Sequence, residues 1–295
     1  MSTDLFSIAV VATMSSGKTT LINSILGIEL LYSANEATTA KITAIRQDND
    51  LLDFQKNGFV KKARSKKITP VKHINKEILV ELNQDVEVSY IEVRGPYQNL
   101  VNMTQSVMIY DSPGPNNSQD KRHQVILERF ISDTKLDLII YVLNATQIGI
   151  EDDKRLLEFI KKVENNTKHI MFVINKVDCL DEEKGENAAT ACENAKRYLS
   201  QFNLSKFDKA AIIPMSSLAI LTASKYLNGH PMSRSERHLL VNVINSMDIG
   251  QELTFSDFQS ISIENKQEIF KQLISSSGLL EFNIQLVNYQ KGLAA

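Results

Sequence analysis

Short apolar runs alternate with longer amphipathic stretches along this chain. The runs have the length and composition of buried strands, and the stretches are long enough for amphipathic helices. The runs predict strands near residues 5–12, 41–47, 106–111, 137–143, 168–174 and 210–215. The stretches predict helices at residues 18–27, 119–134, 152–165, 187–202, 236–247, 263–275 and 279–291. Because strands and helices alternate, we predict an α/β fold with a mostly parallel central sheet flanked by helices.

Two of the apolar runs are apolar on both faces. These are residues 138–143 and 170–174, and such runs are typical of central parallel strands. The stretch from about residue 48 to residue 105 interrupts the alternation of strands and helices. We therefore predict a single domain over residues 1–295 that carries an insertion at 48–105.

The insertion contains two candidate elements and a basic run. Pro70 suits a first helical position, so residues 69–84 could form a helix. Residues 87–93 could add an antiparallel strand at an edge of the sheet. The basic run holds six basic residues in twelve, namely Lys56, Lys61, Lys62, Arg64, Lys66 and Lys67. We favour a solvated loop over a surface for phospholipid, nucleic acid or an acidic protein.

Composition places the chain among ordinary globular proteins. It has 295 residues, of which 43% are hydrophobic and 23% charged, and a net charge of -2. This charge creates no overall field that attracts nucleic acid, and we expect no nucleic-acid partner. The two cysteines, Cys179 and Cys192, and the five scattered histidines show no zinc-ligand spacing. We expect a reducing cytoplasmic location.

The first candidate chemistry is a phosphate-binding loop. Residues 12–19 read A-T-M-S-S-G-K-T, between the apolar run at 6–11 and a predicted helix. Successive N–H groups of such a loop, together with the helix N-terminus, bind phosphate oxygens. Lys18 would reach the outer phosphates, and the hydroxyl of Thr19 would bind Mg²⁺. Ala12 replaces the usual first glycine, so the first bend must keep a negative φ.

Three further segments each follow an apolar run, and together they select the nucleotide. Asp111-Ser112-Pro113-Gly114 offers a carboxylate for Mg²⁺ and a glycine N–H for the γ-phosphate. In Asn175-Lys176-Val177-Asp178, the Asp178 carboxylate matches the two N–H donors of guanine, which adenine lacks. Backbone N–H groups of Ser216 and Ser217 could donate to guanine O6. Each segment alone could be a turn, a helix start or a cap, but all four follow strands in chain order.

We therefore predict a guanine nucleotide site at one edge of the sheet. The nucleotide-binding candidates are Thr13, Met14, Ser15, Ser16, Gly17, Lys18, Thr19, Thr20, Thr38, Thr39, Asp111, Gly114, Asn175, Lys176, Asp178, Ser216 and Ser217. The magnesium-ligand candidates are Thr19, Thr39 and Asp111. Thr39 is our choice for the threonine that senses the γ-phosphate, with Thr38 as the alternative and Thr43 as a weaker one.

The motif set A-T-M-S-S-G-K-T, A-T-T-A-K-I-T, D-S-P-G-P-N-N-S and N-K-V-D resembles the dynamin superfamily of large GTPases. L-N-A-T-Q-I-G-I-E-D and the long insertion fit its bacterial dynamin-like members better than small GTPases. The resemblance covers about residues 6–217 and implies a G domain that pairs with a second copy across the nucleotide. It also implies a helical stalk, and a membrane or protein partner that is contacted by regions beyond this chain. We therefore expect this chain to be a fragment of a longer protein.

The resemblance also implies catalytic roles, for which the candidates are Ser15, Lys18, Thr39 and Gly114. In dynamins the residue matching Ser15 helps to hold a monovalent cation, K⁺ or Na⁺. Many GTPases orient water with a glutamine where this chain has Pro115, and eukaryotic dynamins use a glutamine where it has Met14. The carbonyl of Thr39 or Gly114, or a group from a second copy, would then position the water.

We thus expect a Mg²⁺-dependent GTPase with slow basal turnover that rises on pairing of its G domains. Two alternatives remain open. The chain could be a switch or assembly-factor GTPase that acts on an RNA or protein partner, which the basic run at 56–67 would fit. It could also be a GTP-binding module without catalysis, given Ala12, Met14 and Pro115.

Overall fold

The computed structural model describes residues 5–32, 41–48, 57–63, 67–112, 121–246 and 253–293. In this part of the chain, nine strands form one sheet in the order β4-β3-β5-β2-β6-β1-β7-β8-β9. The strands are β1 (Leu5–Ala12), β2 (Ile42–Gln47), β3 (Asn57–Lys62), β4 (Ile68–Val71), β5 (Val88–Gly95), β6 (Ser106–Asp111), β7 (Leu136–Asn144), β8 (Thr167–Asn175) and β9 (Ala211–Met215). Five neighbouring pairs are parallel and three are antiparallel. The predicted fold class is confirmed.

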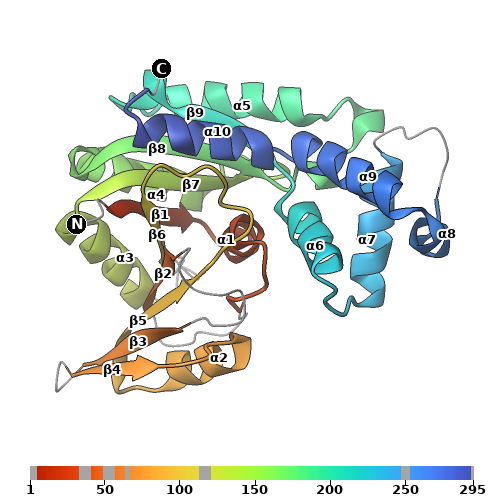
Figure 1. The fold of residues 1–295 in the computed structure, drawn as a ribbon. Coiled ribbons are helices and arrows are strands. Elements are labelled where there is room, and N and C mark those ends of the chain that lie inside the picture. Colours follow the sequence, from red (N-terminus) through yellow and green to blue (C-terminus); the bar gives the residue numbers. More distant parts are fainter. Residues whose placement is uncertain are drawn as a thin grey trace.

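Helices cover both faces of the sheet (Figure 1). They are α1 (Lys18–Leu26), α2 (Lys76–Gln84), α3 (Lys121–Asp133), α4 (Glu151–Val163), α5 (Ala188–Ser200), α6 (Ser217–Leu227), α7 (Arg234–Asn245), α8 (Phe255–Ser260), α9 (Ile263–Ser276) and α10 (Leu279–Gln290). All six predicted strands and all seven predicted helices are present, with ends that shift by a few residues. The sequence did not predict β3, β4, α6 or α8.

The central strands are buried on both faces because successive side chains point to opposite sides. In β1, Ile8, Val10 and Ala12 join a core with α1, α6 and α10. Ala9 and Val11 face the other way, into a core with α3, α4 and α5. β7 and β8 are divided in the same manner, as their continuous apolar runs predict.

Residues 57–95 extend the sheet beyond β2, and two predictions for this stretch are correct only in part. The predicted helix at 69–84 is a strand followed by a helix, because Pro70 lies in β4 and α2 begins only at Lys76. A proline lacks an N–H, so it is tolerated in an edge strand such as β4. The predicted antiparallel edge strand is β5. It is antiparallel to β3 and parallel to β2, and it is not an edge strand because it lies between these two. That 48–105 is an insertion stays a prediction.

The basic run is only partly described. Its described members are Lys61, Lys62 and Lys67, and Lys62 is paired with Glu87 at 2.7 Å. The other three members, including Arg64, lie outside the described residues. Both interpretations of this run therefore stay predictions.

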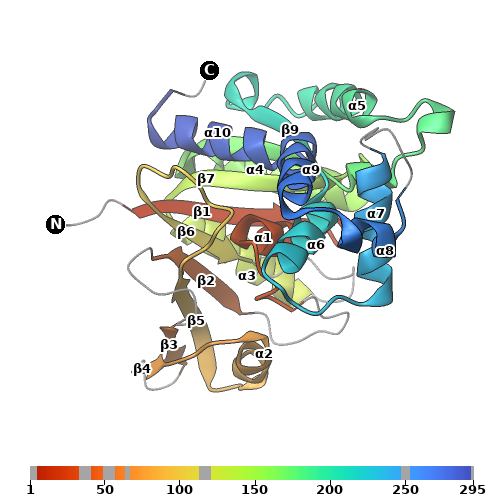
Figure 2. The ribbon, with the colours of Figure 1, turned by 45° about the vertical axis from the view of Figure 1, so that its right-hand side comes forward.

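The helices α7, α8 and α9 form a lateral group beside the sheet (Figure 2). They share a third core with the C-terminal half of α6, centred on Leu240, Phe258, Phe270 and Leu273. Tyr226 of α6 contacts Phe258 and Phe270, with ring centroids 5.2 and 5.6 Å apart. α6 therefore connects this helical group to the sheet. None of the helices in the described ranges is long and apolar enough to cross a bilayer.

Candidate guanine nucleotide site

The phosphate loop, residues 13–17, joins the end of β1 to the start of α1. Ala12 is the last residue of β1 and is absent from the left-handed region, which confirms the predicted negative φ. The bend falls later, at Ser15 (φ 63°) and Gly17 (φ 84°). The N–H groups in the first turn of α1 have no partners inside the helix, so loop and helix together offer donors to an anion.

The side chains of the loop divide into buried and exposed ones. Thr13 and Ser16 are buried, their hydroxyl oxygens lie 2.9 Å apart, and the Thr13 hydroxyl donates to Asp153 at 2.9 Å. Met14 exposes 51% of its surface, and Ser15 is also exposed. Thr13 and Ser16 therefore use their hydroxyls within the protein and offer a nucleotide mainly their backbone groups.

Lys18 and Asp111 are brought together from separate elements. Lys18 begins α1, and Asp111 ends β6, which lies beside β1 with Val10 opposite Asp111. The Lys18 ammonium pairs with the Asp111 carboxylate. Thr19 and Thr20 are half-buried in the first turn of α1. The Thr19 hydroxyl and the Asp111 carboxylate are hard oxygen donors, so this donor set fits Mg²⁺.

Asn175 links the phosphate loop to the last strand of the sheet. It ends β8, opposite Met215 of β9, and its side chain is buried. Its amide nitrogen donates to the Ser16 carbonyl at 2.9 Å, and its amide oxygen accepts from the Ser217 N–H at 3.3 Å. A Cβ atom on Gly17 would lie 2.4 Å from this amide nitrogen, so only glycine fits there. To contact the base as predicted, the Asn175 amide would have to bind it in addition to these two partners.

Asp178 is exposed, and a neighbouring strand end positions it. The Ser216 hydroxyl donates to the Asp178 carboxylate at 2.5 Å, and Lys176 before it adopts a left-handed φ of 67°. The Ser216 N–H is bonded to the Ser277 carbonyl at 3.1 Å. The predicted donation from Ser216 and Ser217 to guanine O6 would therefore require each N–H group to divide its hydrogen bond between O6 and its present acceptor.

Several predicted site residues lie outside the described residues. They are Thr38, Thr39, Gly114 and Pro115. Thr43, the weaker alternative to Thr39, is buried in β2 opposite Asp111. The remaining candidates all lie at or just after the carboxyl ends of β1, β6, β8 and β9. Parallel strands bring those ends to one edge of the sheet, where open α/β sheets bind ligands.

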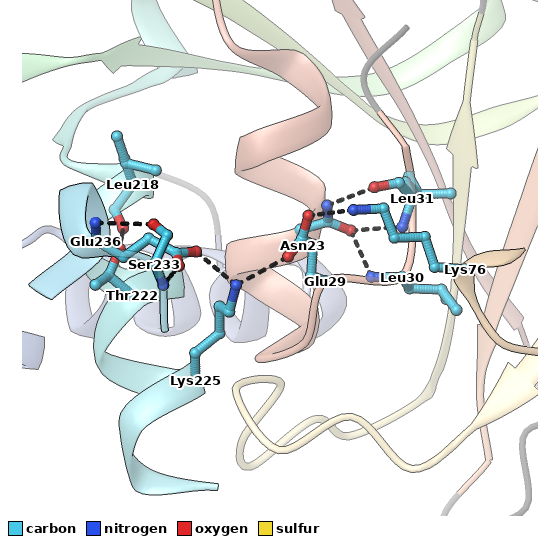
Figure 3. Close-up of polar contacts among 10 residues, drawn as sticks. All are labelled: Asn23, Glu29, Leu30, Leu31, Lys76, Leu218, Thr222, Lys225, Ser233 and Glu236. Atoms are coloured by element: carbon cyan, nitrogen blue, oxygen red, sulfur yellow. Dashed lines mark hydrogen bonds and ion pairs between the residues drawn. The ribbon is translucent and has the colours of Figure 1, made fainter. Parts of the chain in front are cut away.

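The segment that follows α1 is held by polar contacts from three helices (Figure 3). The Asn23 side chain accepts from the N–H groups of Leu30 and Leu31, at 3.1 and 2.8 Å. Glu29 pairs with Lys76 of α2 at 2.5 Å and with Lys225 of α6 at 3.0 Å. These contacts hold residues 29–31, which precede the predicted Thr38 and Thr39 in the sequence.

Sequence reasoning missed two residues that support the site. The Ser112 hydroxyl donates to the Val10 carbonyl at 2.8 Å, which fastens the end of β6 to β1. Asp153 of α4 holds the phosphate loop through Thr13. A signal for Asp153 does exist, because it lies three, four and seven residues before Leu156, Leu157 and Ile160, on the buried face of α4.

Comparisons with known proteins identify a family and similar chains. A model of the dynamin family matches residues 8–177. An uncharacterized protein in the xynA 3′ region of Caldicellulosiruptor sp. (strain Rt8B.4) is 26% identical over 232 residues, which are 78% of this chain and 53% of that protein.

Two solved structures report an oligomerised bacterial dynamin pair as a mechanism for long-range sensing and tethering of membranes. They align with 97% of this chain and 44% of their own chains, with TM-scores of 0.53 and 0.51 at 15% and 16% identity. At such identities the likeness establishes the fold alone. The chain spans about half the length of the relatives that it matches.

Proposed function

Because the chain belongs to the dynamin family, we propose that it binds GTP and hydrolyses it to GDP and phosphate. The observation that carries this proposal is the convergence of three groups at one sheet edge. Lys18, directly after the phosphate loop, lies against Asp111, and Asn175, three residues before Asp178, is bonded to that loop. The site thus offers N–H donors and a cation for phosphates, a carboxylate for a metal, and a carboxylate for the base.

Each group at the phosphates has a role that follows from its chemistry. The N–H groups of the loop and the ammonium of Lys18 neutralise phosphate oxygens. Thr19 and Asp111 would hold Mg²⁺, which when bound offsets charge on the outer phosphates. We propose that Thr39, with Thr38 as the alternative, completes the metal site, and that Gly114 contacts the γ-phosphate. Ser15 would hold a monovalent cation.

The base is selected by Asp178, whose two oxygens can accept the N1–H and N2–H₂ donors of guanine. The hydroxyl of Ser216 holds that carboxylate at 2.5 Å. Lys176 precedes Val177 and Asp178 at the start of the same short turn, where its stem could cover the face of the base. This pairing explains a preference for GTP over ATP.

Hydrolysis would be completed by a second copy of the chain. Neither Met14 nor Pro115 can orient water, since a thioether is a weak acceptor and proline lacks a polar side chain. Pairing of two G domains could supply or orient the missing group. We further propose that the protein acts in the cytoplasm and that parts beyond this chain reach a membrane, which the solved relatives are described as tethering.

The first prediction tests the base-binding residue. Asp178→Asn should weaken GTP binding about tenfold to a hundredfold and improve xanthosine triphosphate binding, because one acceptor becomes a donor. Titration calorimetry measures the dissociation constants of both nucleotides for the variant and for the unmodified protein. Asp181→Asn, a change three residues further on, should leave both affinities unaltered.

Lys18→Ala provides the positive control, because it should weaken both nucleotides equally by removing the cation at the phosphates. If Asp178→Asn binds GTP as tightly as the unmodified protein while Lys18→Ala does not, the base-recognition assignment is wrong.

A further inference from the structure

A buried carboxylate lies directly behind the phosphate loop. Asp153 is the third residue of α4 and exposes only 1% of its surface. Its neighbours on the same helical face, Leu156, Leu157 and Ile160, are buried apolar residues. An ionised side chain at such a position costs free energy, and burial accordingly raises the pKa of Asp153.

Three segments of the chain donate hydrogen bonds to this carboxylate, two of them to one oxygen and one to the other. Oδ1 accepts from the Thr13 hydroxyl of the phosphate loop at 2.9 Å, and from the Tyr141 hydroxyl at 3.4 Å. Oδ2 accepts from the N–H of Gly149 at 3.3 Å. Gly149 belongs to a mostly exposed segment, residues 145–150, that links β7 to α4. The carboxylate therefore bridges the phosphate loop and this segment.

The direction of the hydrogen bonds follows from the donors available. Thr13 has a single hydroxyl hydrogen, and it is directed at Oδ1 of Asp153. The hydroxyl of Ser16, 2.9 Å from that of Thr13, must then donate to Thr13. The chain of bonds runs from Ser16 through Thr13 to Asp153, and it fixes two of the five loop residues from behind.

We propose that Asp153 is a positioning residue that sets the shape of the phosphate loop through Thr13 and ties the loop to residues 145–150. The proposal rests on the proposed function, since it concerns the same GTP site. Asp153 does not reach the nucleotide and acts only by holding the backbone N–H groups of the loop in a phosphate-binding arrangement. A displacement of residues 145–150 would move Asp153, and through it the backbone N–H groups that bind the phosphates.

The test compares retention of a fluorescent GDP analogue among variants, with thermal unfolding of each as a second readout. Thr13→Val keeps the shape of the side chain but removes the hydroxyl, and Asp153→Asn presents a donor to Gly149. Each should speed GDP release about tenfold or more, as expected for loss of a hydrogen bond to a charged group. Thr13→Ser, which keeps the hydroxyl, should recover most of the loss caused by Thr13→Val.

Asp152→Asn is the matched control, because Asp152 is the exposed neighbour on the same helix turn and should release GDP at the normal rate. The double variant Thr13→Val with Asp153→Asn should be no faster than the faster single variant, since both changes break the same link, which runs from Thr13 through residue 153 to Gly149.

The proposal is overturned if Thr13→Ser and Thr13→Val release GDP equally fast, or if Asp153→Asn lowers only the unfolding temperature. Full additivity of the two changes would also overturn it. Failure of the unmodified protein to retain guanine nucleotide would remove the proposed function as well. If the unmodified protein retains GDP and the variants release it at the same rate, only the proposed role of Asp153 is refuted.

Discussion

At the scale of single residues, Gly17 shows why a phosphate loop needs glycine at this point. Its φ of 84° is left-handed, and a Cβ atom there would lie 2.4 Å from the Asn175 amide nitrogen. Gly17→Ala should lose about 1–2 kcal/mol through backbone strain, and about 1–3 kcal/mol more if Asn175 is pushed off the Ser16 carbonyl. Urea unfolding measures both. Gly185→Ala is the matched control, with φ of 76° and no atom within 4 Å; equal losses would refute the clash.

The sequence predicted where the candidate residues lie, because their places at strand ends follow from the local pattern. Lys18, Asp111 and Asp178 follow strands in the expected order, and parallel strands bring such ends together. Asp153 was not predicted, because acidic residues are common in the first turn of any helix and only the third of three here is buried. Nor could the sequence reveal that Asn175 is bonded within the protein on both sides, since that depends on where α6 begins.

At the scale of elements, α1 begins after the phosphate loop and α6 begins after Ser216, and their far ends are connected. Lys225 on α6 pairs with Glu29 at 3.0 Å and with Glu236 on α7 at 2.5 Å. Lys225→Met keeps the stem but removes the charge, and should cost about 1 kcal/mol at neutral pH, as a small network allows. Lys184→Met, at an exposed pair with Asp181, is the control and should cost nothing measurable.

The pH dependence of this difference has a definite sign. Burial of Glu29 and Glu236 favours their neutral forms, but hydrogen bonds from lysine outweigh it and lower both pKa values below 4.5. A carboxylate with a lowered pKa stabilises the fold above its unfolded pKa and loses that effect as the pH falls through the folded pKa. The stability gap between Lys225→Met and the unmodified protein should therefore close below about pH 4.5. An unchanged gap in acid unfolding curves would contradict the network.

The elements that the sequence did not predict in the sheet depend on pairing between strands that are far apart in the sequence. Pro70 suits either a first helical position or an edge strand, because neither needs its missing N–H. Pairing of Phe59 in β3 with Pro70 decides between them, and no local pattern contains that pairing. For the same reason β5 was placed at the edge of the sheet, although the hairpin of β3 and β4 covers its outer side.

At the scale of the whole molecule, exposed apolar side chains follow three of the strands that end at the site. Met14, Ile150 and Leu218 expose 51%, 38% and 45% of their surfaces, and they follow β1, β7 and β9 at the edge where we place the nucleotide. Pairing across the nucleotide, as proposed above, would bury such side chains at the centre of the interface, where apolar residues are enriched.

Turnover per molecule should therefore rise with protein concentration and level off as pairing saturates. Leu218→Glu places a charge within this interface and should flatten the rise while leaving GDP affinity in dilute protein intact. Leu227→Glu alters the opposite end of the same helix, at a side chain 52% exposed, and should preserve the rise. Phosphate release measured over a hundredfold range of protein concentration gives the answer. A constant rate per molecule in the unmodified protein would mean that one copy contains every group that hydrolysis needs.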